Sequence, residues 1–162
     1  MAKTKRIIIT ILLRLLAFGA TLSATVVMVT SHESAKVMNI KFSAKFSNSP
    51  TFKFYVTAEA IATGYGLIVL FLSSRRSVDR LIVILDVVIA LILTSSISAA
   101  LAVAQIGKKG DSHAGWLPVC NQVPKFCDHV TGALIAGFVA AIAYLVLNLY
   151  SLHVFLTPLF PV

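Results

Sequence analysis

The sequence has few charged residues and little chain outside its apolar segments. Only 12% of its 162 residues are charged and 58% are hydrophobic, whereas a soluble domain has about 25% charged and about 45–50% apolar residues. The connecting loops are too short to hold a soluble domain or an ATP-binding loop. This composition indicates a membrane protein.

Four apolar segments are long enough to cross a bilayer, because about 20 residues span the hydrocarbon core as a helix. We predict spanning helices over residues 7–29, 54–72, 81–104 and 130–155. The expected fold is an all-α bundle of four transmembrane helices, a single membrane domain over residues 1–162.

Basic residues indicate the orientation of the spans. Four spans place both termini on one side, together with the turn that carries Arg75, Arg76 and Arg80. These arginines and the basic N-terminal tail lie in short segments next to helices, where the positive-inside rule applies. We therefore predict cytoplasmic termini. The net charge of +8 is divided between two surfaces without a recognition motif, so no nucleic-acid partner is expected.

The first span contains Arg14 and the third contains Asp86. At 1.5 Å per residue, Arg14 lies about 10 Å and Asp86 about 7 Å inside the cytoplasmic boundary. Each unpaired charge costs about 2.5–3.5 kcal/mol on insertion scales, so we predict a structural ion pair. The alternative is that each side chain reaches the cytoplasmic headgroups separately.

Tyr65 and Asn148 fall in the same layer when the second and fourth helices are counted back from their cytoplasmic ends. They are predicted to complete a network around the ion pair. The alternative is an ordinary packing tyrosine and an interhelical asparagine hydrogen bond.

Glu59 is the one acidic residue in the outer half of the predicted spans. A channel or transporter requires ionisable groups along a path through the membrane, and Glu59 with the Arg14/Asp86 pair would be its candidates. Because Glu59 is close to the start of its helix, we favour a carboxylate that reaches outer headgroups or a lysine of the first loop.

Small residues recur every four positions in the predicted helices. In the fourth helix Ala133, Gly137 and Ala141 follow one another in this way, beside Gly132. Such strips let helix backbones approach closely in lipid. We expect some of them to close the bundle and at least one to face a neighbouring protomer.

Cys120 and Cys127 are the only cysteines, and both lie in the second outer loop. An even count in an oxidising compartment indicates a disulfide, worth about 2–3 kcal/mol in the chain-entropy model. The nearby His113 and His129 lack the spacing of zinc ligands, so no metal or cofactor is expected. Trp116 fits an anchor at the membrane surface.

The first outer loop alternates apolar and polar residues over positions 40–47, which predicts a β-strand. Residues 48–50 supply turn chemistry, and residues 51–56 are predicted to return as a second strand. The expected product is a small extracellular β-hairpin. Its lysine face would bind anionic polymers or simply keep the hairpin soluble; this face comprises Lys41, Lys45 and Lys53.

The joint order of these features resembles the plant CASP-like proteins, relatives of the Casparian strip membrane domain proteins. The resemblance rests on Arg14 followed by LLAFGATLSATVVM, on Asp86, and on the loop and helix GWLPVCNQVPKFCDHVTGALIAGFVA. It extends through essentially the whole chain.

The resemblance implies a MARVEL-related four-helix protein of the plasma membrane without catalytic activity. Such proteins self-associate into homo- and hetero-oligomers that organise membrane domains at the cell wall. The implied partners are the chain itself, related family members, membrane lipids, and wall polymers or secreted wall enzymes. The first outer loop lacks the short signature of the strip-forming members, so the resemblance implies a CASP-like scaffold and assigns it neither a tissue nor a part in lignin deposition.

Overall fold

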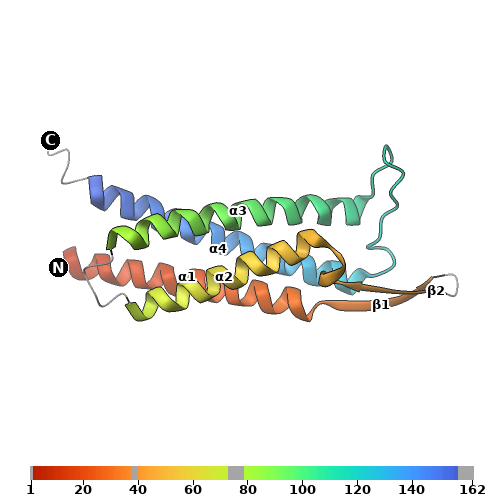
Figure 1. Ribbon diagram of the computed structural model, residues 1–162, viewed down its shortest axis with the longest axis horizontal. Coiled ribbons are helices and arrows are strands. Elements are labelled where there is room, and N and C mark those ends of the chain that lie inside the picture. Colours follow the sequence, from red (N-terminus) through yellow and green to blue (C-terminus); the bar gives the residue numbers. More distant parts are fainter. Residues whose placement is uncertain (1, 38–39, 73–78, 157–162) are drawn as a thin grey trace.

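Four long helices dominate the computed structural model, which describes residues 2–37, 40–72 and 79–156 (Figure 1). They are α1 (Ala2–Thr30), α2 (Pro50–Leu72), α3 (Asp79–Lys109) and α4 (Pro124–Leu156). Each contains a segment long and apolar enough to cross a membrane.

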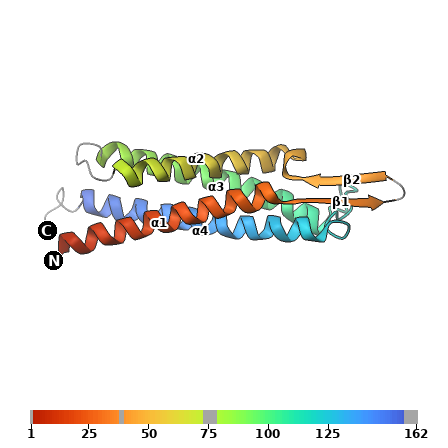
Figure 2. The ribbon, with the colours of Figure 1, turned by 90° about the horizontal axis from the view of Figure 1, so that it is seen from below.

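The four helices form a bundle in which chain neighbours run antiparallel. α1 packs against α2 and α4, and α3 packs against the same two helices. The two perpendicular views show the pairs side by side (Figures 1 and 2). α1 and α3 therefore face each other across one diagonal of the bundle, and α2 and α4 across the other. The start of α1 and the end of α4 lie at the same end of the molecule (Figure 1).

A two-stranded antiparallel sheet lies at the opposite end of the bundle (Figure 2). It pairs β1 (His32–Val37) with β2 (Ile40–Lys45), and a short 3₁₀ helix, Phe46–Asn48, leads into α2. In the register Lys41 is opposite Lys36, and Lys45 is opposite His32. The alternating pattern thus marks a real strand, but its partner precedes it in the chain.

The predicted second strand at residues 51–56 is wrong, because this segment forms the first turns of α2. Pro50 occupies the first helical position, where its missing N–H is not needed. The apolar segment that follows must satisfy its own backbone hydrogen bonds in lipid, which a helix does and a single strand does not. Lys53 consequently lies on a helix, and the sheet carries only the other two members of the predicted lysine face.

Small side chains occupy the contacts between helices, and large apolar ones cover the outside. The side chains of Ala24, Ala62, Ala100 and Ala140 have no exposed surface, whereas Phe71 is 78% exposed. This distribution suits a bundle in hydrocarbon, where lipid is as apolar as leucine and close packing holds the helices together.

The strip on α4 illustrates this packing. Ala133 and Ala141 are buried, and a Cβ placed at Gly137 would lie 2.5 Å from the Tyr55 hydroxyl oxygen. A Cβ at Gly132 would meet nothing within 4 Å. The strip from Ala133 to Ala141 therefore closes the bundle from within, while Gly132 is on the outside.

We predict that Gly137→Ala destabilises the bundle by about 1–3 kcal/mol, because the added methyl group displaces a buried tyrosine. Gly132→Ala is the matched control on the same helix and should leave stability within about 0.5 kcal/mol. Thermal unfolding of both purified variants in lipid nanodiscs measures the difference. Equal stability of the two variants would contradict the packing described here.

Candidate functional site

Arg14 on α1 and Asp86 on α3 meet inside the bundle. The guanidinium donates two hydrogen bonds to the carboxylate, from Nη1 to Oδ1 at 3.2 Å and from Nη2 to Oδ2 at 2.7 Å. Asp86 is fully buried and Arg14 is 8% exposed. A buried carboxylate that accepts two hydrogen bonds from the guanidinium does not fit the alternative in which each side chain reaches the headgroups separately.

The structure also brings the two candidate network residues to this pair. The Tyr65 hydroxyl of α2 lies 2.7 Å from Asp86 Oδ1 and donates to it. Nδ2 of Asn148 on α4 donates to the backbone carbonyl of Asp86 at 3.2 Å. Each of the four helices thus contributes one polar group to a single cluster around Asp86, which we call the Asp86 cluster.

The Asp86 cluster joins the α1–α3 diagonal, and two tyrosines join the other one. The Tyr55 hydroxyl donates to the Ala133 carbonyl at 2.5 Å, and the Tyr144 hydroxyl donates to the Ala62 carbonyl at 3.3 Å. Sequence reasoning missed both, because a backbone carbonyl acceptor leaves no trace in residue identity. The available signal was a tyrosine inside an apolar span, where a hydroxyl must find a partner.

Glu59 does not behave as expected from its position near the start of α2. Its side chain is completely buried, and neither carboxylate oxygen has a hydrogen-bond partner among the described residues. It therefore reaches neither the outer headgroups nor a lysine of the first loop. A Cβ at Gly137 would lie 2.7 Å from Glu59 Oε1, so the carboxyl sits against the backbone of α4.

A disulfide and a hydrogen bond link the loops at the sheet end of the molecule. A disulfide joins Cys120 to Cys127, whose Cα atoms are 5.7 Å apart. Glu33 of β1 accepts a hydrogen bond from the backbone N–H of Phe126 at 2.9 Å. This N–H is in the first turn of α4, where a negative charge is favourable. The sheet is thereby held to the loop that the disulfide closes.

Trp116 lies in the same loop and is 59% exposed. Two backbone hydrogen bonds of 2.9 Å pair it with Asp111, and Gly115 provides a positive φ of 71° in the turn between them. The exposed ring is available as the predicted surface anchor. The described residues contain no group of three or more His, Cys, Asp or Glu side chains that could hold a metal ion.

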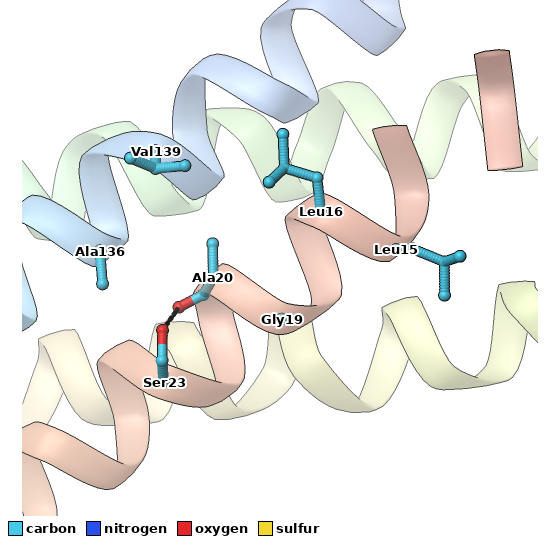
Figure 3. A pocket seen from close by; sticks show the side chains of 7 residues that line it. All are labelled: Leu15, Leu16, Gly19, Ala20, Ser23, Ala136 and Val139. Atoms are coloured by element: carbon cyan, nitrogen blue, oxygen red, sulfur yellow. Dashed lines mark hydrogen bonds between the residues drawn. The ribbon is translucent and has the colours of Figure 1, made fainter. Parts of the chain in front are cut away.

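A groove lies on the outer surface between α1 and α4 (Figure 3). Its volume is about 400 Å³. The Ser23 hydroxyl in it donates to the Ala20 carbonyl at 2.9 Å, so the groove surface is essentially apolar (Figure 3). The lining residues are Leu15, Leu16, Gly19, Ala20, Ser23, Ala136 and Val139.

A family model described as the Casparian strip membrane protein domain matches residues 3–143. The chain belongs to this family. CASP-like protein 1C1 of Vitis vinifera is 62% identical over 158 residues, which are 98% of this chain and 99% of the relative. CASP-like protein 1C3 of Populus trichocarpa is 63% identical over 162 residues, 100% of this chain and 99% of the relative. No solved structure gives a significant match.

The comparisons confirm the resemblance that the sequence motifs indicated, and they identify a CASP-like membrane protein. In this CASP-like chain four of the motif residues form two pairs. Arg14 and Asp86 form the ion pair of the Asp86 cluster, and Cys120 and Cys127 close the loop at the other end of the molecule.

We predict that Arg14→Ala and Asp86→Ala each lower the stability of this CASP-like chain by about 3–5 kcal/mol, because each leaves one buried charge unpaired. The reciprocal exchange, Arg14→Asp with Asp86→Arg, should restore part of the loss. The fraction of monodisperse protein on size-exclusion chromatography measures it. Lys109→Ala removes an exposed lysine and serves as the control. If the exchange behaves no better than the single variants, the direct contact is not what stabilises the bundle.

Proposed function

We propose that this CASP-like chain is a non-enzymatic scaffold of the plasma membrane that self-associates and organises membrane domains at the cell wall. It would assemble with copies of itself and with related family members. The observation that carries the proposal is the apolar groove between α1 and α4, on the outside of the bundle, where four of the seven lining residues are small.

The groove is suited to a second protomer. Gly19 and Ser23 on α1 are four residues apart and exposed, and Gly132 and Ala136 on α4 repeat that spacing. A Cβ at Gly19 or Gly132 would meet nothing within 4 Å. Exposed small residues at this interval let another helix approach closely in lipid. We infer that the groove surface of one copy packs against the same surface of a second copy, in a two-fold symmetric contact.

The disulfide supports an orientation with cytoplasmic termini. Disulfides persist in oxidising environments, so the end of the bundle that carries Cys120–Cys127 would face the cell exterior. The start of α1 and the end of α4 lie at the opposite end (Figure 1). This orientation agrees with the distribution of basic residues in short segments.

The proposed outer surface carries exposed lysines and apolar side chains. Lys45, Lys108, Lys109 and Lys125 are exposed, and so are Trp116 and Leu117. Positive charge of this kind attracts anionic polymers. Wall polymers or secreted wall enzymes are the partners we propose for this surface, and membrane lipids for the sides of the bundle.

A small channel or transporter is the competing function, and the buried carboxyl of Glu59 is the observation in its favour. The charges of Arg14 and Asp86 are engaged with each other, which leaves no free charge there for a solute. A scaffold should release no more solute from liposomes than protein-free vesicles do. Measured flux that Glu59→Gln abolishes would replace the scaffold with a transporter.

We predict that Gly19→Leu fills the groove and weakens self-association at least about tenfold, or about 1.4 kcal/mol. The variant should still fold, because a Cβ at Gly19 meets nothing within 4 Å and the groove is on the outer surface. Gly64→Leu is the matched control, since Gly64 is an equally open glycine on α2, away from the groove.

Stepwise photobleaching of labelled chains in liposomes, at several protein-to-lipid ratios, gives the oligomer distribution of each variant. The proposal expects monomers to accumulate only with Gly19→Leu. If wild type and both variants distribute alike, lipid fills the groove and protomers associate elsewhere. A wild type that is monomeric at every ratio would reject self-association itself.

A further inference from the structure

Glu59 is a buried acidic group that the scaffold function does not use. It lies nine residues after Pro50, about 14 Å along α2. Its side chain has no exposed surface, and both carboxyl oxygens lack a hydrogen-bond partner among the described residues. The backbone of α4 passes beside it, since a Cβ at Gly137 would be 2.7 Å from Oε1.

The contrast with Asp86 shows what Glu59 lacks. The carboxylate of Asp86 accepts from both terminal nitrogens of Arg14 and from the Tyr65 hydroxyl. Arg14 pairs with Asp86, and neither carboxyl oxygen of Glu59 has such a partner. An ionised carboxylate without a partner costs several kcal/mol in such surroundings, so such a group takes up a proton instead.

The titratable neighbours of Glu59 do not change this conclusion. They are Tyr55 on its own helix and Tyr144 on α4, and a phenol is neutral near pH 7. On α1 and α3 the charged groups inside the described bundle are Arg14 and Asp86, which neutralise each other. Nothing in the described part of the chain offers Glu59 a cation.

Because Tyr55 lies beside Glu59, a proton on Glu59 affects the hydrogen bond that the Tyr55 hydroxyl donates. Its hydroxyl donates to the Ala133 carbonyl and thereby ties α2 to α4. The site of a Cβ on Gly137 is within 2.7 Å of both the Tyr55 oxygen and Glu59 Oε1, so the two side chains share one space. A hydroxyl has a single proton to donate. An anionic Glu59 would be a stronger acceptor than the carbonyl and would draw that proton away from α4.

We propose that Glu59 is a proton-binding site inside the membrane domain, and that its bound proton keeps the Tyr55 hydroxyl on α4 and the outer halves of α2 and α4 closed. Loss of the proton transfers the hydrogen bond of Tyr55 from Ala133 to Glu59 and loosens the contact between α2 and α4. The site does not depend on self-association through the groove.

Infrared spectroscopy of the full chain in liposomes tests the protonation directly. A protonated carboxyl has a carbonyl stretch above the amide bands, which a carboxylate lacks. We expect the difference spectrum of wild type minus Glu59→Gln to contain this band at neutral pH. Wild type minus Glu33→Gln, a carboxylate of the sheet, should not contain it. A missing band in the first difference would overturn the proposal.

The pH dependence of thermal unfolding tests the link to Tyr55. The folded chain holds a proton that the unfolded chain releases, so stability falls as pH rises, by up to tenfold in the unfolding constant per pH unit. Glu59→Gln keeps a neutral side chain and should abolish this component. Tyr55→Phe should be less stable than wild type at neutral pH. Identical pH profiles for wild type and Glu59→Gln would reject the site.

An alkali cation is the competing ligand, because a carboxylate, a phenol and a backbone carbonyl also suit a metal ion. The same infrared difference is therefore recorded with sodium, potassium or choline chloride at equal ionic strength and pH. A proton site gives the same band in all three salts. Loss of the band in sodium or potassium alone would assign a cation site and overturn the proposal.

Discussion

A carboxylate buried among apolar helices is the constraint on which the rest of this bundle depends. Asp86 must receive hydrogen bonds wherever it lies, and it receives them from Arg14 on α1 and Tyr65 on α2, while Asn148 on α4 bonds its backbone carbonyl. Contacts between alanines and leucines tolerate small rotations and shifts of a helix. A bidentate ion pair does not, because its donors and acceptors fix both distance and direction. The Asp86 cluster therefore sets the depth and rotation of the helices around it.

The helices on the two diagonals of the bundle are joined by different kinds of polar contact. Near the end of the molecule at which α1 starts and α4 ends, the ion pair of Arg14 and Asp86 joins α1 to α3. On the other diagonal, neutral hydroxyls cross from Tyr55 and Tyr144 to backbone carbonyls. Neighbouring helices approach closely at alanine and glycine, and Tyr65 on α2 and Asn148 on α4 add hydrogen bonds to Asp86 on the adjacent α3.

Sequence reasoning succeeded where depth alone decides the neighbours. Counting 1.5 Å per residue from the ends of the spans placed Arg14, Tyr65, Asp86 and Asn148 in one layer, and straight helices bring such residues together. The same counting was wrong for Glu59. Depth gave the distance of Glu59 from the outer surface, but it did not give the face of α2 on which Glu59 lies. Because that face points into the bundle, the carboxyl contacts neither headgroups nor lysines.

The sheet shows a second limit of sequence reasoning. Alternation at residues 40–45 marks a strand, but it does not name the partner strand. Residues 51–56 alternate as well, yet they open an apolar span, and the membrane requirement for internal hydrogen bonds outweighs a local pattern. The true partner, His32–Val37, is mostly polar and alternates only over its last four residues.

The inward direction of Arg14 also determines which surface the molecule presents to lipid. Residues advance by 100° per position around a helix, so Gly19 and Ser23 lie on the side of α1 opposite Arg14. Asn148 ties α4 to the same cluster through Asp86, so the spacing of the two helices that border the groove follows from it. A charge pair hidden from lipid thus fixes the lipid-facing surface that we propose for assembly. This connects the two features of the chain without requiring that either Arg14 or Asp86 touch a partner.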